Sequence, residues 1–424
     1  MRKLSLFFIS IALIYVAACN SSAGESSTGV PQPTQQPTAA FQCTDPIGCV
    51  TIAPGAPIHI TWIQSVTGIT APLGTTNVRG AEVALNEIGF QVLGHPIQWD
   101  GTDGACSLEG GQSAAAEVLI DPNVVAVIGG TCSAEVRGAM PAISQAGLVM
   151  ISSSAADPEL TGSEHLPGFL RTSHNILQQG SLAAEFAFSQ LNLTRAATIN
   201  DGRPVDQRLQ QAFVDAFVAL GGTITSQETV ALGETNMATL LARIASGTPQ
   251  LIYFPIFEPE GSLIASQKCT IFGLENTALI SADGLLTSGF PATAGPCALG
   301  MYLSGPFVDP AVQADFLNSY SSLFGEGPAS AFGPHSYDAV KMLLAAIEQV
   351  AVMDADGTLH ISRQALRDAL YSTSSFGGLT GSLTCSASGD CASGQALAIF
   401  QITQENLDGA ADLLTNSPVW VPSR

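Results

Sequence analysis

The stretch at 124–133, Val-Val-Ala-Val-Ile-Gly-Gly-Thr-Cys-Ser, predicts the fold of this protein. Its first five residues are all apolar, as expected of a strand that is buried on both faces of a parallel sheet. Two glycines end the strand, a helical pattern follows over 134–146, and a second apolar strand follows at 148–151. This order of strand, turn, helix and strand predicts a β-α-β unit.

The same alternation of apolar strands and amphipathic helices continues from a strand at 58–63 to a strand at 396–402. It pauses at 166–168, Leu-Pro-Gly, and then restarts with the same rhythm. We therefore expect an α/β protein with two doubly wound lobes, joined by crossovers that act as a hinge. Ligands of such sheets bind beyond the carboxyl ends of the strands, which predicts a site between the lobes.

Capping residues predict where two of the helices begin. Asn77 follows a Gly/Thr/Pro-rich loop at 67–76 and precedes an apolar helical pattern. Ser362 precedes a similar pattern that extends to Tyr371. We expect each of these two side chains to cap the helix that follows it.

The composition excludes several classes of protein. The chain has 424 residues, of which 46% are hydrophobic and only 12% are charged, and its formal net charge is −21. A surface this acidic argues against binding to nucleic acid and against electrostatic docking on anionic lipid. The apolar and periodic character of most of the chain argues against general disorder.

The N-terminal segment is predicted to direct export. Two basic residues precede an apolar run that ends at Ala18, and as a helix this run would extend about 22 Å, short of the roughly 30 Å hydrocarbon core. Residues 1–18 are therefore expected to be a signal peptide. Small residues before Cys19 resemble the bacterial lipobox, which implies a lipid on Cys19; an ordinary export signal with an incidental cysteine is the alternative.

Residues 19–45 are rich in Ser, Thr, Gly, Pro and Gln, and they predict a flexible tether. The protein would then be exported and held by its lipid at the outer face of the cytoplasmic membrane, or lie in the periplasm. The membrane is thus a predicted partner only through the anchor.

The cysteine count favours disulfides over a metal site. Nine cysteines are present, and setting Cys19 aside leaves eight, an even number in an exported chain. Eight cysteines can pair in 105 ways. No C-x-x-C motif occurs and the six histidines lack ligand-like spacing, so we expect no metal and no cofactor. Local spacing favours the pairs Cys43–Cys49, Cys106–Cys132, Cys269–Cys297 and Cys385–Cys391.

Three stretches carry a more specific resemblance: 127–133 (Val-Ile-Gly-Gly-Thr-Cys-Ser), 150–161 (Met-Ile-Ser-Ser-Ser-Ala-Ala-Asp-Pro-Glu-Leu-Thr) and 168–173 (Gly-Phe-Leu-Arg-Thr-Ser). In order and spacing they resemble the periplasmic leucine/isoleucine/valine-binding proteins, type I solute-binding proteins of branched-chain amino acid ABC transporters. The resemblance extends over about residues 56–405. Cys106 and Cys132 fall where these proteins carry a disulfide.

The resemblance implies a division into two lobes, each of which is made from two segments of the chain. The N-terminal lobe is expected to contain residues 56–175 and 306–390. The C-terminal lobe is expected to contain residues 176–305 and 391–424. The stretch at 168–173 would be the first crossover between the lobes.

The resemblance also implies where a ligand binds. Family members hold the α-carboxylate of an amino acid with a serine after the second disulfide cysteine, which is Ser133 here. The loop after Met150 completes this grip through Ser154 and Ala156, and Ala156 lacks a hydroxyl that the family commonly has. A carboxylate before a glycine pairs with the ammonium, and Asp283 holds that place.

The apolar wall departs from the family pattern. Leu73 and Val205 replace two tyrosines, and Phe257 holds a third aromatic position without a hydroxyl. This wall fits a bulkier or more apolar ligand than leucine. Weak binding, or a ligand that is not an amino acid, would also fit.

Several neighbouring residues have a plainer interpretation. Ser133 could be a simple helix N-cap, and Asp283 alone could be a turn residue. Glu135 and Arg137 are expected to form a solvated pair on a helix surface, while Arg203 could be a second anion contact.

The sequence contains no catalytic motif, and its scattered histidines suggest no catalytic triad. We therefore expect that the protein is not an enzyme. The chain is instead expected to bind a small molecule, an amino acid above all, and to deliver it to an ABC permease. A ligand sensor, or a scaffold lipoprotein that regulates an envelope partner, are the alternatives.

Overall fold

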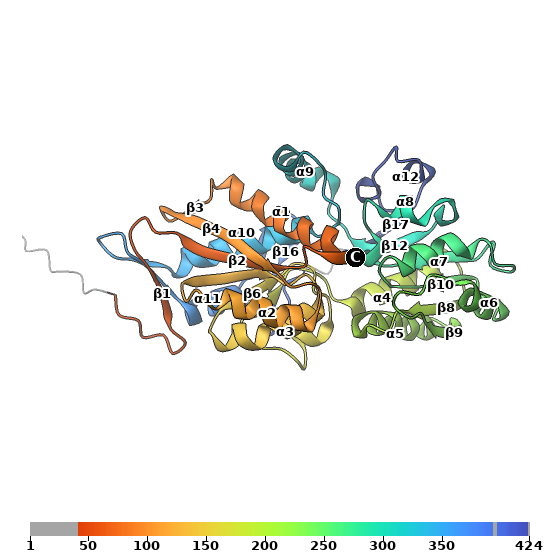
Figure 1. The fold of residues 1–424 in the computed structure, drawn as a ribbon, viewed down its shortest axis with the longest axis horizontal. Coiled ribbons are helices and arrows are strands. Elements are labelled where there is room, and N and C mark those ends of the chain that lie inside the picture. The colour runs from red at the N-terminus through yellow and green to blue at the C-terminus, as the bar shows by residue number, and fades with distance from the viewer. Residues whose placement is uncertain (1–40, 393–396, 423–424) are drawn as a thin grey trace, which may run out of the picture. The chain divides into compact units, whose positions relative to one another are not determined.

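The computed structural model describes residues 41–392 and 397–422. Two six-stranded sheets form its framework (Figure 1). The first sheet has the order β3 (Gln91–Val92), β4 (His95–Asp103), β2 (Ile58–Gln64), β5 (Val124–Gly129), β6 (Val149–Ser152), β7 (Phe169–Arg171). The second has the order β17 (Leu397–Gln401), β12 (Tyr302–Pro306), β11 (Ala278–Ser281), β10 (Leu251–Tyr253), β8 (Arg195–Asn200), β9 (Thr223–Thr229).

Each sheet is parallel except at one edge. β3 pairs with β4 in antiparallel fashion in the first sheet, and β17 pairs with β12 in the same way in the second. The remaining neighbours are parallel. The predicted α/β fold with two doubly wound lobes is confirmed.

Helices cover both faces of each sheet. Around the first sheet these are α1 (Ala71–Glu87), α10 (Gly333–Val350) and α11 (Arg363–Tyr371) on one face, and α2 (Leu108–Val118) and α3 (Ser133–Gln145) on the other. Around the second sheet they are α4 (Ile176–Glu185) and α5 (Pro204–Ala219) on one face, and α6 (Ala238–Ser246), α7 (Glu260–Lys268) and α8 (Phe290–Ala294) on the other. Two further α-helices of the described residues are α9 (Pro310–Phe324) and α12 (Gln404–Leu407). Short strands form two small sheets. One has the order β1 (Cys49–Ile52), β14 (Leu359–Ser362), β13 (Val352–Met353), and the other is the hairpin of β15 (Phe376–Gly378) and β16 (Gly381–Leu383).

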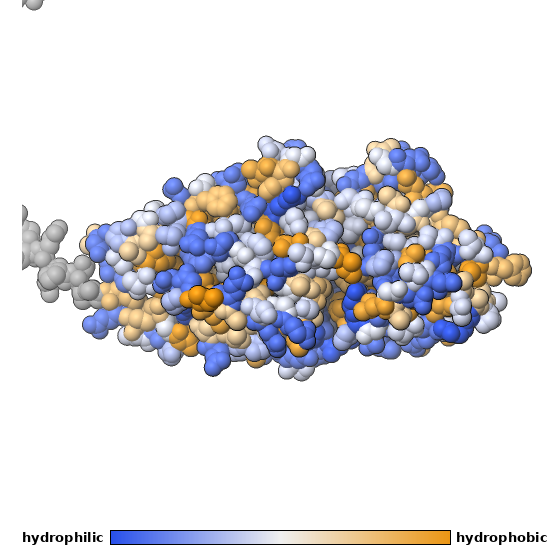
Figure 2. Space-filling view, viewed as in Figure 1, coloured by the Kyte–Doolittle hydropathy of each residue, from blue (hydrophilic) through white to orange (hydrophobic). Residues whose placement is uncertain are grey.

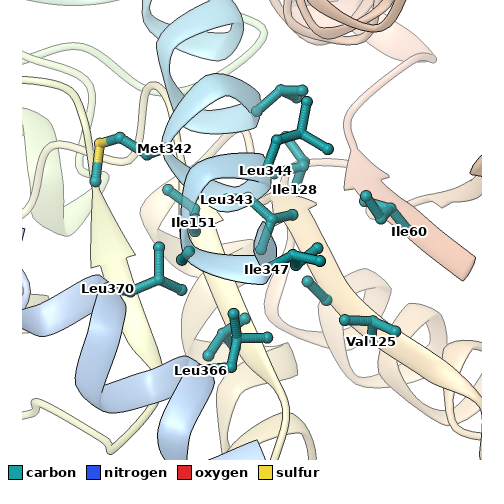
Figure 3. Close-up of a cluster of buried hydrophobic side chains, with 14 of the residues drawn as sticks. Ile60, Val125, Ile128, Ile151, Met342, Leu343, Leu344, Ile347, Leu366 and Leu370 are labelled. Carbon is teal, nitrogen blue, oxygen red and sulfur yellow. The ribbon is translucent and has the colours of Figure 1, made fainter. Parts of the chain in front are cut away.

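The first sheet explains why β5 is apolar at every position. Val125 and Ile128 pack toward α10 and α11, whereas Val124 and Val127 pack toward α2 and α3. Figure 3 shows the first of these two cores, in which Ile347 of α10 lies close to the strand residues. On the outer surface in Figure 2, apolar residues are scattered among hydrophilic ones.

The predicted start of α1 is wrong. The helix begins at Ala71, six residues before Asn77, with Pro72 in its first turn, where the fixed φ of proline favours a helix. Asn77 is fully buried inside the helix, and its side chain donates to Gln64 Oε1 (3.2 Å) and to Ser154 Oγ (2.9 Å). Its amide therefore connects the helix to the first sheet instead of capping it.

The predicted cap of α11 is confirmed, because Ser362 Oγ accepts a hydrogen bond from Ala365 N (3.3 Å). We expect Ser362→Ala to lower the free energy of unfolding by about 1 kcal/mol, the usual contribution of a serine cap. Urea titrations measure this change. Ser246→Ala, at the exposed C-terminal end of α6, is the control and should change stability by less than about 0.5 kcal/mol. An equal effect of both substitutions would contradict the capping role.

The eight cysteines form the four disulfides that the spacing favoured: Cys43–Cys49, Cys106–Cys132, Cys269–Cys297 and Cys385–Cys391. The predicted signal peptide, Cys19 and most of the predicted tether lie outside the described residues. Within the described ranges, no helix has the length and apolar character needed to cross a membrane. Those ranges also hold no cluster of His, Cys, Asp or Glu that could bind a metal ion.

Candidate ligand-binding site

A cavity of about 540 Å³ lies beyond the carboxyl ends of strands from both sheets. Its walls come mainly from segments that follow β2, β4, β5 and β6 in the first sheet and β8, β10 and β11 in the second. Strand ends of parallel sheets meet at one edge, so segments far apart in the sequence reach the same space. The seven residues expected to contact a ligand all line this cavity: Leu73, Ser133, Ser154, Ala156, Val205, Phe257 and Asp283.

Ser133 can offer a hydrogen to an anion. It is the first residue of α3, and Cys132 occupies the N-cap position, so Ser133 is not the simple cap that was the alternative. Ser133 Oγ accepts a hydrogen bond from Asp157 N (3.2 Å). Because this bond uses an oxygen lone pair, the hydroxyl hydrogen remains for another acceptor. The N-terminus of the helix adds a favourable dipole for a negative group.

Ser154 has a different capacity. Its Oγ donates to the Thr131 carbonyl (2.8 Å) and accepts from Asn77 Nδ2 (2.9 Å). The hydroxyl hydrogen is therefore already in use, and Ser154 can only accept a hydrogen bond from a ligand. The Thr131 hydroxyl in turn donates to Gln64 Oε1 (2.6 Å). Of these three lining hydroxyls, only that of Ser133 is left as a donor to an anion.

Glu135 and Arg137 are not a solvated pair, and this expectation is wrong. Glu135 is fully buried in the first turn of α3, where burial raises its pKa to about 8. Arg137 lines the cavity and donates to Asp157 (2.6 Å) and to Glu164 (2.5 Å). Helical periodicity alone could not show that both residues face the protein interior and the cavity.

Asp283 lines the cavity from the side of the second sheet, in a short 3-10 helix (Asp283–Leu285) that follows β11. Its Oδ1 accepts from Gln179 Nε2 (2.9 Å), and burial raises its pKa to about 6. His174 Nε2 lies 3.9 Å from Oδ2, but burial lowers the pKa of His174 to about 4, so this histidine is neutral at pH 7. In the described part of the chain, Asp283 has no arginine or lysine within ion-pair distance. A ligand ammonium could supply the missing positive charge.

Arg203 lines the same cavity but is already engaged. Its Nη1 donates to Asp201 (2.8 Å) and lies 3.9 Å from Asp206 Oδ2. Its guanidinium lies over the ring of Phe257, with the Cζ atom 5.3 Å from the ring centre. Arg203 therefore supports the wall around Phe257, and its action as a second anion contact stays a prediction.

The apolar wall is larger than the sequence indicated. Further large apolar side chains line the cavity, among them Ile69, Leu108, Ile176, Leu209 and Phe332. They come from loops and helix starts, where no strand pattern singles them out. Ile69, Leu108 and Ile176 follow shortly after β2, β4 and β7, and this position was the available signal; Leu209 lies within α5 and Phe332 just before α10, where no such signal exists.

Two parallel sheets that share a lined cavity beyond their strand ends define a two-lobed solute-binding protein. Residues 57–408 match the family model described as periplasmic binding protein, and the chain belongs to this family. Members of this family are substrate-binding proteins of transporters and not enzymes.

Individual relatives are more distant. The chain is 29% identical over 297 residues to the Leu/Ile/Val-binding protein BraC3 of Rhizobium johnstonii, which covers 69% of this chain and 80% of the relative. The fold is similar to that of LivJ of Streptococcus pneumoniae, a substrate binding protein of a branched-chain amino acid transporter solved with isoleucine (TM-score 0.72, 21% identity, covering 82% and 96% of the two chains). It is also similar to that of a solute binding protein of R. palustris solved with benzoate (TM-score 0.70, 20% identity, covering 82% and 94%).

Proposed function

We propose that this protein is an extracytoplasmic lipoprotein that binds an amino acid with an apolar side chain, branched-chain or similar, between its lobes. It delivers this ligand to an ABC permease. The observation that carries the proposal is that Ser133, which follows a strand of the first sheet, and Asp283, which follows a strand of the second, line the same cavity.

The two charged ends of an amino acid fit the two ends of this site. The carboxylate would accept from the Ser133 hydroxyl and from free N–H groups at the start of α3. The ammonium would pair with Asp283, whose carboxylate is held by neutral donors, the Gln179 amide and the backbone N–H groups of Asp283 and Gly284, and lies near the neutral His174. Ala156 and Ser154 line the carboxylate end without giving it a hydrogen.

The apolar wall of Leu73, Val205 and Phe257 would cover the side chain of the ligand. Burial of apolar surface contributes about 25 cal/mol per Å², so this wall favours leucine, isoleucine or a larger apolar side chain. BraC3, which is named a Leu/Ile/Val-binding protein, and LivJ with isoleucine support this class.

Aromatic acids are the second candidate class, because the R. palustris neighbour binds benzoate. Such a ligand could use the carboxylate end and the apolar wall. It would bring no positive charge to Asp283, however, and would leave a half-buried carboxylate desolvated without a partner. The charge of the site therefore favours an amino acid.

Anchoring and delivery complete the proposal. A lipid on Cys19 and the Ser/Pro-rich segment after it would keep the folded body near the membrane and its permease. Two alternative functions differ in how the cavity is used. A ligand sensor would bind its ligand in the same cavity and then contact a signalling partner, whereas a scaffold lipoprotein would bind no ligand there.

Isothermal titration calorimetry with L-leucine, L-isoleucine, L-valine, L-phenylalanine and benzoate tests the function. We expect micromolar or tighter binding of at least one of the four amino acids, and much weaker binding of benzoate, because only the amino acids satisfy Asp283. Preferential binding of benzoate would contradict the amino acid class. If no probe bound, the scaffold function would be favoured. If an amino acid bound, but cells without the protein still took it up at the normal rate, the sensor function would be favoured.

A further inference from the structure

We infer that Asp157 is a positioning residue that connects the anion end of the cavity to the opposite lobe. Asp157 follows β6 in the first lobe and does not itself line the cavity. Its side chain is fully buried, yet it is a carboxylate with two arginine partners. Such a buried acid at the border between two lobes needs a reason beyond packing.

The two arginines come from different lobes. Arg137 of α3 donates through Nη2 to Asp157 Oδ2 (2.6 Å), and Arg208 of α5 donates through Nη1 to Asp157 Oδ1 (2.5 Å). α3 packs on the first sheet and α5 on the second. The carboxylate thus forms an ion bridge from one lobe to the other, which we call the Asp157 bridge (Arg137, Asp157 and Arg208).

The bridge is strong at its centre and exposed at one end. Burial alone would raise the pKa of Asp157, but hydrogen bonds from Arg137 and from the Glu159 N–H outweigh burial and keep the pKa below its ordinary value. The Arg208 side chain is 39% exposed, and within the described residues the only hydrogen-bond partner of this side chain is Asp157. Arg208 can therefore leave the bridge when the lobes separate, without disturbing another interaction.

The backbone of Asp157 contacts a residue that lines the cavity. Asp157 N donates to Ser133 Oγ (3.2 Å), which fixes the orientation in which the Ser133 hydroxyl can donate to an anion. Arg137, the other partner of the carboxylate, also lines the cavity. Any movement of Asp157 toward or away from Arg208 is therefore transmitted to two residues at the anion end.

This arrangement gives the bridge two consequences. It stabilises the approach of the two lobes, and it gives Asp157, whose backbone N–H holds Ser133 Oγ, a second anchor when they are together. Closure of a two-lobed protein around a ligand is a hinge motion whose equilibrium such a bridge would bias. The effect on ligand affinity rests on the proposed function, whereas the effect on closure does not.

The test compares Arg208→Gln with the control Arg243→Gln in the full-length protein. Arg243 is also in the second lobe and in an ion pair, with Glu228 (2.7 Å), but Glu228 belongs to β9 of the same lobe, so this pair does not connect the lobes. Small-angle X-ray scattering measures the radius of gyration of the ligand-free variants, and calorimetry measures the Kd for L-leucine and L-phenylalanine. Arg208→Lys keeps the charge and should partly restore the wild-type values.

We expect Arg208→Gln to increase the radius of gyration and to weaken binding about threefold to tenfold, mainly through faster dissociation, since a partly exposed ion pair contributes modestly. Arg243→Gln should change neither quantity. A scattering profile of Arg208→Gln that equals that of the wild type would overturn the inference. A larger radius with no amino acid bound by any variant would support the bridge and refute the proposed ligand class instead.

Discussion

Asp283→Asn is expected to raise the Kd for L-leucine or a similar amino acid about a hundredfold or more. A ligand ammonium inside the cavity loses its water, and Asp283 is the cavity-lining carboxylate that we propose pairs with it. Removing one partner of a buried charge pair costs about 3–5 kcal/mol, because the other charge stays desolvated. Calorimetry at pH 7.5 measures the change.

The same substitution should make the ligand-free protein more stable. Burial raises the pKa of Asp283 from 3.8 to about 6, so the folded protein favours the neutral form. The stability that this group contributes is complete below the unfolded pKa and is lost as the pH rises through 6. At pH 7, where the wild type keeps an unfavourable charge, the asparagine variant should be more stable by about 1–3 kcal/mol. Opposite effects on binding and on stability are characteristic of a binding residue.

Asp338→Asn is the matched control. Asp338 of α10 is a fully buried acid, whereas the Asp283 side chain is 18% exposed; the Asp338 oxygens accept from Leu379 N (2.8 Å) and Thr380 N (2.9 Å), and Asp338 does not line the cavity. We expect this variant to lose stability and to keep its ligand affinity. If Asp283→Asn behaved in the same way as this control, Asp283 would be a structural residue and the site assignment would be wrong.

The raised pKa of Asp283 also predicts how wild-type binding depends on pH. Below pH 6 the ligand-free site holds a protonated Asp283, which must lose its proton to pair with an ammonium. The affinity for L-leucine should therefore fall about tenfold per pH unit between pH 6 and the lower pKa of the complex. The asparagine variant should show a flat profile in this range.

The main strands and their parallel arrangement could be predicted because burial on both faces leaves a visible pattern. β5 is apolar at each position for the reason that its two faces pack against different helices. The disulfides followed from local spacing, and the shared cavity of Ser133 and Asp283 is consistent with the family resemblance. These features depend on short stretches of sequence whose order is enough to place them.

The features that were missed depend on contacts between distant segments. Asn77 resembles a cap in sequence, but its amide has partners in β2 and after β6. Arg137 looks solvated by helical periodicity, yet its partner Asp157 is twenty residues away in the chain. Glu135 is buried because glycines at 104 and 130 leave room for it, and a side chain at Gly104 would collide with its carboxyl group. No local pattern encodes such packing.

Glu135→Gln should raise the free energy of unfolding at alkaline pH. Glu135 is fully buried, its Oε2 has no hydrogen-bond partner among the described residues, and burial raises its pKa from 4.5 to about 8. Since the folded pKa is raised, the stability linked to this group is complete below pH 4.5 and is lost as the pH rises through 8. Glutamine has the shape of the protonated acid and cannot ionise. At pH 9 the variant should be more stable than the wild type by about 2–4 kcal/mol, and near pH 4.5 the two should be equal.

Urea titrations at pH 5, 7 and 9 measure this divergence, and Glu109→Gln is the control. Glu109 also lies in the first turn of a helix, α2, but it is exposed, so its replacement should give a difference that does not grow toward pH 9. A constant difference between Glu135→Gln and the wild type at the three pH values would show that Glu135 ionises normally in the folded protein.

The position of Glu135 connects this stability effect to binding. It is the third residue of α3, whose N-terminus faces the cavity through Ser133. A negative charge there would oppose the carboxylate of a ligand at the same helix end, whereas the neutral acid leaves the helix dipole available. Wild-type affinity for L-leucine should therefore decline above pH 8, and Glu135→Gln should keep its affinity up to pH 9, where the ligand ammonium is still largely protonated. Since amino acid binding is expected to need an ionised Asp283 and a neutral Glu135, we expect tight binding only between about pH 6 and pH 8.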